Sequence, residues 1–284
     1  MTTSPEQTPR SVDPRDYQTV PRPLAAMAKS FADGIEIAPH AHQRDQFLYA
    51  VDGIMRVRTR GEAWIVPPNR AVYIPALTEH AISVRGNLEM RTLYLAPGAA
   101  AGLPTSPTVF EVSDLLRNLI VALIGEPVLY DEAGRGGALA TLILSEITSA
   151  RRLALGVAMP RDARLERLCA ALVADPSSRL TLERWSEIAG ASARTLARLF
   201  ERETGMSFGA WRRRVRLHNA IEQIVAGEPV ARVAARSGYR SASAFSAAFR
   251  RSMGVAPSAL RDSRADYAQA VARAGAAPAD SSER

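Results

Sequence analysis

Three of the chain's four histidines have a spacing that could bind a ligand. His40 and His42 are two residues apart, so in a strand both side chains point to one face of a sheet, and a neighbouring strand could bring His80 to them. Their imidazole nitrogens and the amide oxygen of Gln46 are suitable ligands for one divalent transition metal. The same groups could instead hydrogen-bond a small effector or pack as polar core residues, and the sequence leaves these alternatives open.

A second set of residues occurs twice near the carboxyl end. Leu196, Phe200 and Gly205 follow Gly190, and Phe245, Phe249 and Gly254 follow Gly238 in the same order. The offset between the copies is 48 residues up to the first glycine and 49 after it, so the second turn has one extra residue. Apolar positions at helical spacing around a glycine turn predict two helix-turn-helix units.

The second helix of each predicted unit has a polar outer face. Ser192 and Ser241 precede these helices and can cap their free N–H groups. Subtracting the apolar positions leaves, for contact with DNA, Ala193, Arg194, Thr195, Ala197 and Arg198 in the first unit and Arg240, Ser243, Ala244, Ser246, Ala247 and Arg250 in the second. Arginine pairs with guanine, serine and threonine adapt to several base edges, and alanine contacts the thymine methyl group. We therefore predict direct readout of double-stranded DNA, with the two cap serines included in the surface.

The charge distribution supports a DNA-binding carboxyl-terminal domain. Residues 161–264 contain 19 basic and 10 acidic side chains, whereas residues 1–160 contain 15 and 16. A basic domain releases counterions from a phosphate backbone, and Arg212 and Arg213 on the helix that joins the units are expected to hold phosphates. Because the first domain is not basic, nonspecific packing of DNA by the whole chain is disfavoured.

Residues 165–261 resemble the DNA-binding domain of the AraC/XylS family of bacterial transcription regulators. The most specific strings are FERETGMSFGAWRRRVRL at residues 200–217 and GYRSASAFSAAFRRSMGVAPSALR at residues 238–261. The resemblance implies recognition helices at residues 193–203 and 242–253, and a sequence-specific regulator that activates or represses transcription. We expect RNA polymerase, a small-molecule effector and a second copy of the chain as partners.

The histidines belong to a spacing that resembles the two motifs of the cupin superfamily. The matching positions are Gly34, His40, His42, Gln46 and Gly53, followed by Gly61, Pro67 and His80. This resemblance implies a small β-barrel that senses an effector or dimerises. Metal-binding cupins usually have glutamate where Gln46 stands, which disfavours the alternative function, a metal-dependent cupin enzyme fused to a DNA-binding domain.

The elements needed to position these residues predict a two-domain α+β fold. Short alternating apolar runs, broken at Gly53, Gly61 and Gly86 among other turn residues, predict strands between residues 25 and 95. Helical stripes follow at residues 115–123 and 139–147, and their apolar faces must pack on the barrel or on a second subunit. We divide the chain into a disordered tail (1–23), a cupin-like effector and dimerisation domain (24–155), a linker (156–162), an all-α domain with two helix-turn-helix units (163–264) and a flexible tail (265–284).

Two further features bear on the compartment. The single cysteine, Cys169, has no partner for an internal disulfide, and its apolar surroundings predict a buried structural thiol. No run approaches the roughly 20 apolar residues of a membrane span, and the first 23 residues lack the apolar core of a signal peptide. We therefore expect a cytoplasmic protein.

Overall fold

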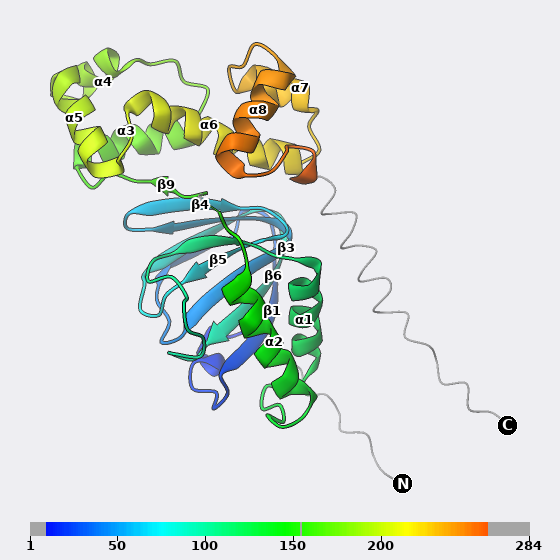
Figure 1. The fold of residues 1–284 in the computed structure, drawn as a ribbon. Coiled ribbons are helices and arrows are strands. Elements are labelled where there is room, and N and C mark those ends of the chain that lie inside the picture. Colours follow the sequence, from blue (N-terminus) through cyan, green and yellow to red (C-terminus); the bar gives the residue numbers. More distant parts are fainter. Residues whose placement is uncertain (1–9, 154, 261–284) are drawn as a thin grey trace, which may run out of the picture.

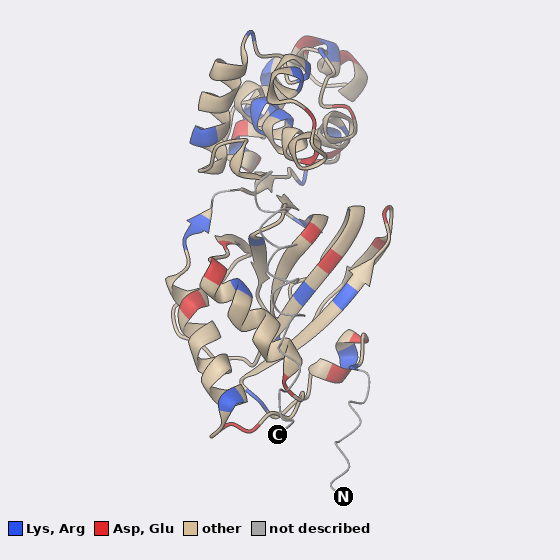
Figure 2. Ribbon diagram, turned by 90° about the vertical axis from the view of Figure 1, so that its right-hand side faces the viewer, with Lys and Arg blue, Asp and Glu red and all other residues tan. Residues whose placement is uncertain are grey.

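The computed structural model describes residues 10–153 and 155–260, which form two bodies (Figure 1). The strands form a barrel with two helices on one side, and the helices that follow form a second body at one end of the barrel (Figures 1 and 2). The expected α+β fold with two domains is confirmed. Below, "the barrel" means strands β1 to β9 and "the helical body" means helices α3 to α8.

The barrel is built on two long central strands, β3 (Asp45–Thr59) and β6 (His80–Leu95). The other strands are β1 (Leu24–Phe31), β2 (Glu36–His40), β4 (Glu62–Val66), β5 (Arg70–Ile74), β7 (Thr108–Glu111), β8 (Arg152–Leu153) and β9 (Val157–Ala158). All pairings are antiparallel, in the order β1-β6-β3-β5-β7-β8, with β2 on β6, β4 on β3 and β9 on β4. Along β3, Leu48 packs in one apolar cluster and its neighbours Phe47 and Tyr49 in another, because alternate side chains point to opposite faces.

Two of the predicted strand breaks are wrong. β3 continues through Gly53 and β6 through Gly86, both at positive φ. At Gly53 a side chain would place its Cβ 2.4 Å from the carbonyl oxygen of Asn87, and the register of β3 against β6 shifts on both sides of Asp52. These glycines therefore allow a bulge within a strand. The bulge separates the part of β3 that pairs with β5 from the part that pairs with β4.

Helices α1 (Asp114–Gly125) and α2 (Arg135–Ser149) match the two predicted helical stripes. Ile120 and Ile143 are fully buried in the apolar cluster that these helices share with the barrel. The expected packing on the barrel is therefore confirmed. Leu115 and Leu142 are more than half exposed, and association with a second subunit stays a prediction.

The prediction of a disordered amino-terminal tail is wrong for residues 10–23, while residues 1–9 lie outside the described part. A short 3-10 helix, η1 (Pro14–Tyr17), places Tyr17 against Tyr94 with ring centroids 5.7 Å apart. The buried guanidinium of Arg44 donates hydrogen bonds to the backbone oxygens of Gln18, Val20, Arg22 and Tyr94. The composition of this segment is polar, but Tyr17 anchors it to the barrel. The sequence did not indicate this contact because Tyr94 is distant in the sequence.

The predicted linker is also more ordered than expected. Val157 and Ala158 form β9, which pairs with Ala63 and Glu62 of β4, so this segment belongs to the barrel. Immediately afterwards Asp162 caps α3 by accepting a hydrogen bond from the backbone N–H of Arg164. The two bodies are therefore joined by a few residues between a paired strand and a capped helix.

The helical body consists of α3 (Ala163–Ala174), α4 (Leu182–Ala189), α5 (Ala193–Thr204), α6 (Phe208–Val225), α7 (Val230–Arg236) and α8 (Ala242–Met253). These bounds agree closely with the two predicted helix-turn-helix units, in which α5 and α8 are the second helices. The first unit has its own core around Phe200 and Trp211, and Cys169 is fully buried in it, so burial raises the pKa of the thiol. The predicted carboxyl-terminal tail (265–284) lies outside the described residues.

Candidate functional site

The first recognition helix, α5, presents its polar side to solvent. Leu196 and Phe200 are fully buried, which fixes the rotation of the helix. Arg194 and Arg198 are exposed, and neither has a hydrogen-bond or ion-pair partner among the described residues. Of the other predicted contact residues, Ala197 is exposed, whereas Ala193 and Thr195 are partly buried.

The second recognition helix, α8, is held in the same way. Phe245 and Phe249 are fully buried, in a cluster that also contains barrel residues. The predicted contact residues Arg240, Ser243, Ala244, Ala247 and Arg250 are exposed, and Ser246 is partly buried. The polar side of each recognition helix is therefore free to meet DNA.

Ser192 and Ser241 have the predicted capping role. The hydroxyl of Ser192 accepts a hydrogen bond from the backbone N–H of Thr195, and the hydroxyl of Ser241 accepts one from that of Ala244, each at 3.2 Å. Glycines in the left-handed conformation, Gly205 and Gly254, end the two helices. Capping is confirmed, and a DNA contact by either serine stays a prediction.

The predicted phosphate contact of Arg212 stays a prediction, and its guanidinium already has partners within the protein. Its guanidinium donates hydrogen bonds to the backbone oxygens of Leu180 and Ser178 in the loop before α4. Arg216, one turn later, donates to the carbonyl oxygens of Pro176 and Ser178. Arg212 therefore holds the loop before α4, and the sequence pattern did not reveal this because the loop lies more than 30 residues earlier. Arg213 is exposed and remains a candidate for phosphate contact.

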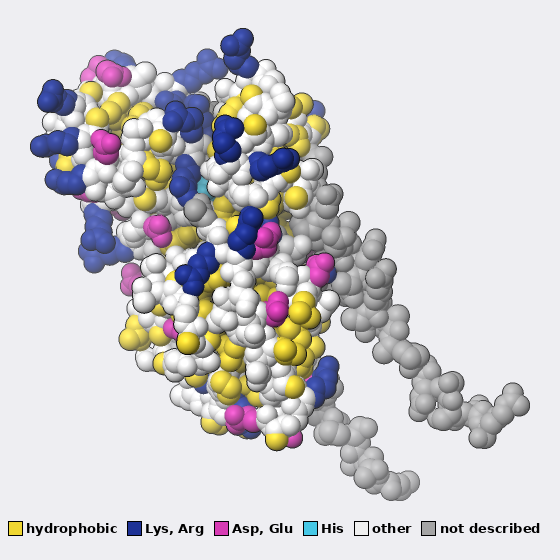
Figure 3. Space-filling view, in the orientation of Figure 1, with side chains coloured by type: hydrophobic (Ala, Val, Ile, Leu, Met, Phe, Trp, Pro, Cys, Tyr) yellow, Lys and Arg dark blue, Asp and Glu magenta, His cyan; other side chains and the backbone are white. Residues whose placement is uncertain are grey.

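Basic side chains gather on the helical body (Figure 3). Several of them face solvent around α5 and α8, including Arg202 and Arg251 at the ends of the recognition helices. This distribution agrees with the excess of arginine in residues 161–264. A surface of this kind attracts a polyanion before specific contacts form.

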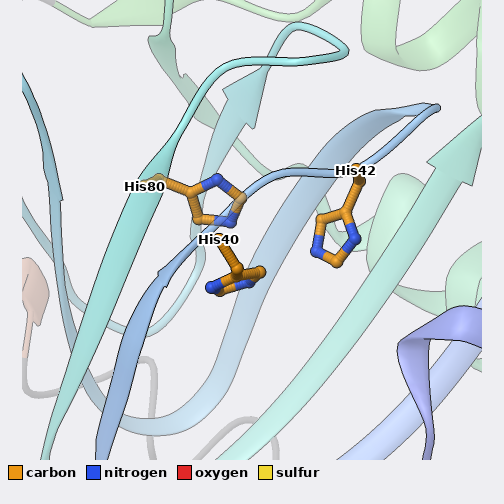
Figure 4. Close-up of side chains that lie close together, drawn as sticks. All are labelled: His40, His42 and His80. Carbon is orange, nitrogen blue, oxygen red and sulfur yellow. The ribbon is translucent and has the colours of Figure 1, made fainter.

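The three predicted histidines do come together (Figure 4). His40 ends β2 and lies opposite His80 of β6, with ring centroids 4.4 Å apart. His42 lies two residues beyond the end of β2, so the expectation that it shares a strand face with His40 is wrong. Its ring centroid is nevertheless 4.9 Å from that of His40, and one ligand nitrogen of each residue lies within 4.8 Å of the others.

The hydrogen bonds of these residues leave nitrogen lone pairs available. Nδ1 of His40 is 2.8 Å from the carbonyl oxygen of Ala38, and Nδ1 of His80 is 3.0 Å from that of Thr78. Because a carbonyl only accepts, each of these Nδ1 atoms carries a proton, and in a neutral ring Nε2 then keeps its lone pair. Burial lowers the pKa of His42 and of His80 to about 4, so both rings are neutral at neutral pH. The buried Nε2 atoms of these two residues have no hydrogen-bond partner in the described part of the chain.

Gln46 lies on β3, where it pairs with Tyr94 of β6, and the Tyr94 ring contacts that of His42. It is buried, and its side-chain oxygen has no hydrogen-bond partner within the described ranges. The centroid of the Tyr94 ring lies 5.4 Å from that of the His42 ring, and the Tyr94 ring also stacks with the ring of Tyr17. Sequence reasoning missed both tyrosines, because no local pattern indicates that two residues 77 positions apart stack beside a histidine cluster.

The barrel and the helical body are joined by direct contacts. Arg56 of β3 makes a two-pronged ion pair with Glu222 of α6, with N–O distances of 2.5 and 2.6 Å. The indole N–H of Trp211 donates to the carbonyl oxygen of Ala158 at 2.6 Å. The helix that joins the two units is therefore fixed to the barrel by an ion pair and a hydrogen bond.

A cavity of about 280 Å³ lies at this junction. The barrel contributes Arg56, Arg58, Trp64, Ile82 and Arg85 to its lining, and the helical body contributes Val173, Val215, His218 and Asn219. His218 is buried, which lowers its pKa to about 3, and its Nε2 has no partner among the described side chains. The three clustered histidines do not line this cavity, so space for a small molecule and the predicted ligand residues occur in different places.

Known proteins resemble the chain over both bodies. Residues 185–263 match a family model described as a helix-turn-helix domain, and residues 30–96 match one described as a cupin domain. The transcriptional regulator NimR of Escherichia coli is 29% identical over 218 residues, which cover 77% of this chain and 80% of NimR. The transcriptional activator RhaR of Klebsiella pneumoniae is 27% identical over 264 residues, covering 84% and 93%.

Solved structures also align with the chain, one over most of its length and one over the carboxyl-terminal part. A structure of ToxT from Vibrio cholerae aligns with 85% of this chain and 99% of its own, at 11% identity and a TM-score of 0.36. The carboxyl-terminal domain of AraT from Geobacillus stearothermophilus aligns with 36% of this chain and 87% of its own, at 30% identity and a TM-score of 0.33. None of the described helices is long and apolar enough to cross a membrane.

Proposed function

We propose that this chain, which belongs to the AraC/XylS family of transcription regulators and carries a cupin domain, binds its operator with α5 and α8 in successive major grooves. About one helical turn, roughly 10 bp, separates the two contacts. The observation that carries this proposal is the pair of exposed arginines on α5, Arg194 and Arg198, whose guanidinium groups have no partner among the described residues. The chain is not an enzyme, since the relatives that match it are named as transcription regulators.

Selection of binding sites from a random duplex library, followed by footprinting with the full chain, tests this proposal. We expect one enriched sequence with two protected segments about one helical turn apart. An equal affinity for all duplexes would refute sequence-specific binding. A single protected segment would refute joint reading by α5 and α8.

We further propose that His40, His42 and His80 bind one divalent transition metal, with Gln46 nearby as a further oxygen ligand. Three imidazoles that each offer one ring nitrogen within 4.8 Å of the others suit zinc, copper or nickel better than magnesium or calcium, which prefer oxygen ligands. The unpartnered Nε2 atoms of His42 and His80 support such a site, because buried polar atoms normally have partners. A bound metal would supply those missing interactions.

Elemental analysis of the purified protein and zinc titration calorimetry test the metal site. We expect about one equivalent of metal in the parent chain and none in a His40→Ala, His42→Ala variant. Glu79→Ala is the control, since Glu79 is exposed and adjacent to His80. Unchanged binding by the double variant would refute the site. The competing proposal, that the histidines bind an organic effector directly, predicts no metal in any of the three proteins.

Regulation requires that the barrel influences the recognition helices, and the junction supplies the connection. The ion pair of Arg56 with Glu222 ties β3 to α6, and α6 lies between the two units. A small-molecule effector or metal that shifts the barrel would therefore change how the two recognition helices are presented. We propose that this change controls activation or repression, with RNA polymerase as partner and with a second copy bound through the surface around Leu115 and Leu142.

A further inference from the structure

The two recognition helices have the same length, the same kind of cap and equivalent buried positions, so their outward residues can be compared position by position. Both contain 12 residues, begin after a capping serine and end at a left-handed glycine. The buried residues Leu196 and Phe200 of α5 correspond to Phe245 and Phe249 of α8 at an offset of 49 residues. Equivalent side chains therefore leave the two helices in equivalent directions.

At the positions that face DNA, the two helices have different chemistry. Arg194 of α5 corresponds to Ser243 of α8, and Arg198 corresponds to Ala247, and all four are exposed. The hydroxyl of Ser243 already lies 3.0 Å from that of Ser241. From residue 242 to residue 249, α8 has only alanine, serine and phenylalanine. The part of the helix that reads bases therefore has no charged side chain.

The positive charges of the second unit lie on either side of this neutral stretch. Arg240 precedes the cap of α8, and Arg250 and Arg251 lie in its last turn, all exposed. Arg250 corresponds to Glu201 of α5, so the ends of the two helices also differ in charge. Arginines at the two ends of a reading helix are placed for phosphates, which fix position without specifying sequence.

Small side chains allow α8 to approach the groove floor closely. Ala244 and Ala247 are exposed on this face, and an alanine methyl group is suited to contact the thymine C5-methyl group in the major groove. By contrast, the long guanidinium side chains of α5 reach the N7 and O6 atoms of guanine from a greater distance. Two helices with the same fold therefore present different side chains to the bases.

We infer that the operator is bipartite, with a guanine-containing half read by Arg194 and Arg198 of α5 and a thymine-containing half read by the methyl groups of Ala244 and Ala247 of α8. This inference rests on the proposed function, since it assigns bases to helices that the proposal places on DNA. It also implies that the first half contributes most hydrogen-bond specificity, because α8 has no side chain there that can make a two-pronged contact with a base.

Base analogues in the selected operator test the inference with the full chain. The half whose preference relaxes in Arg198→Ala is the α5 half. Replacing each thymine by uracil in the other half removes one methyl group and should weaken binding about fourfold per contacted methyl. Replacing guanine by 7-deazaguanine should weaken binding about fivefold or more in the α5 half. Uracil without effect in the α8 half would refute the inference, although the selected operator would still support sequence-specific binding.

A residue exchange provides an independent test. Ala247→Arg gives α8 the residue that α5 has at the equivalent position, and Ala247 is exposed, so the fold should tolerate it. Repeating the selection with this variant should change one position of the α8 half from thymine to guanine. Arg232→Ala, in an exposed position on α7, is the control and should leave base preference unchanged. An unchanged α8 half in Ala247→Arg, with an unaltered melting temperature, would refute the assignment of Ala247.

Discussion

Replacing Glu222 by glutamine is expected to loosen the contact between the barrel and the helical body. The substitution keeps the shape of the side chain and its helix propensity but removes the charge that Arg56 requires. The two side chains are 27% and 18% exposed, so the pair is neither on the open surface nor fully buried. Its contribution should therefore lie between that of a surface pair, about 0–1 kcal/mol, and the 3–5 kcal/mol lost when one partner of a buried pair is removed.

We expect a loss of about 2 kcal/mol. Glu36 contributes a second, weaker favourable interaction to the Arg56 guanidinium and should reduce the loss, because some compensation remains in the variant. For a protein of this size, about 2 kcal/mol corresponds to a decrease of about 4–8 °C in the melting temperature.

Differential scanning calorimetry measures this effect and identifies where it acts. If the pair couples the two bodies, Glu222→Gln should lower the melting temperature and resolve separate transitions of the barrel and the helical body. Glu228→Gln is a matched control, since Glu228 pairs with Arg236 through two contacts of 2.8 and 2.9 Å inside the helical body. Equal decreases in both variants, each with one unsplit transition, would refute coupling through Arg56 and Glu222.

Three other predictions concern base reading, pH and the amino-terminal segment. Arg198→Ala should weaken operator binding by about 1–3 kcal/mol and relax the preference at one base pair, as measured by competition binding; a uniform loss on every sequence would instead indicate a phosphate contact. The pKa values of His42 and His80 fall to about 4 in the folded chain, so the unfolded chain binds more protons between that pH and about 6.5. Stability measured by urea unfolding should therefore fall as pH decreases through this window, and less so in His80→Asn; an equal fall in this variant would exclude His80 as a source. Tyr17→Ala should lower the free energy of unfolding by about 3 kcal/mol in the same assay, because Tyr17 is 1% exposed. Val12 is 53% exposed, so Val12→Ala should lower it by less than about 0.5 kcal/mol. Equal losses in the two variants would contradict the anchoring role of Tyr17.

The recognition helices could be predicted from the sequence because the forces that form them are local. A serine cap, apolar residues at helical spacing and a terminal glycine all lie within 14 residues, as in the segment from Ser192 to Gly205. The residues on the outward face of each recognition helix could then be predicted by removing its apolar positions. The histidine cluster was also predictable, since the cupin spacing indicated that the strand carrying His80 would lie beside His40.

Tertiary structure alone decided the contacts between segments that are far apart in the sequence. Arg56 and Glu222 are 166 residues apart, and Arg212 reaches a loop more than 30 residues earlier, so no local period relates the partners. Tyr17 is anchored although its segment has the composition of a mobile tail. Such contacts depend on which surfaces meet when the chain compacts. A solvated arginine and a buried, paired one have the same sequence signature, and only the position of the partner distinguishes them.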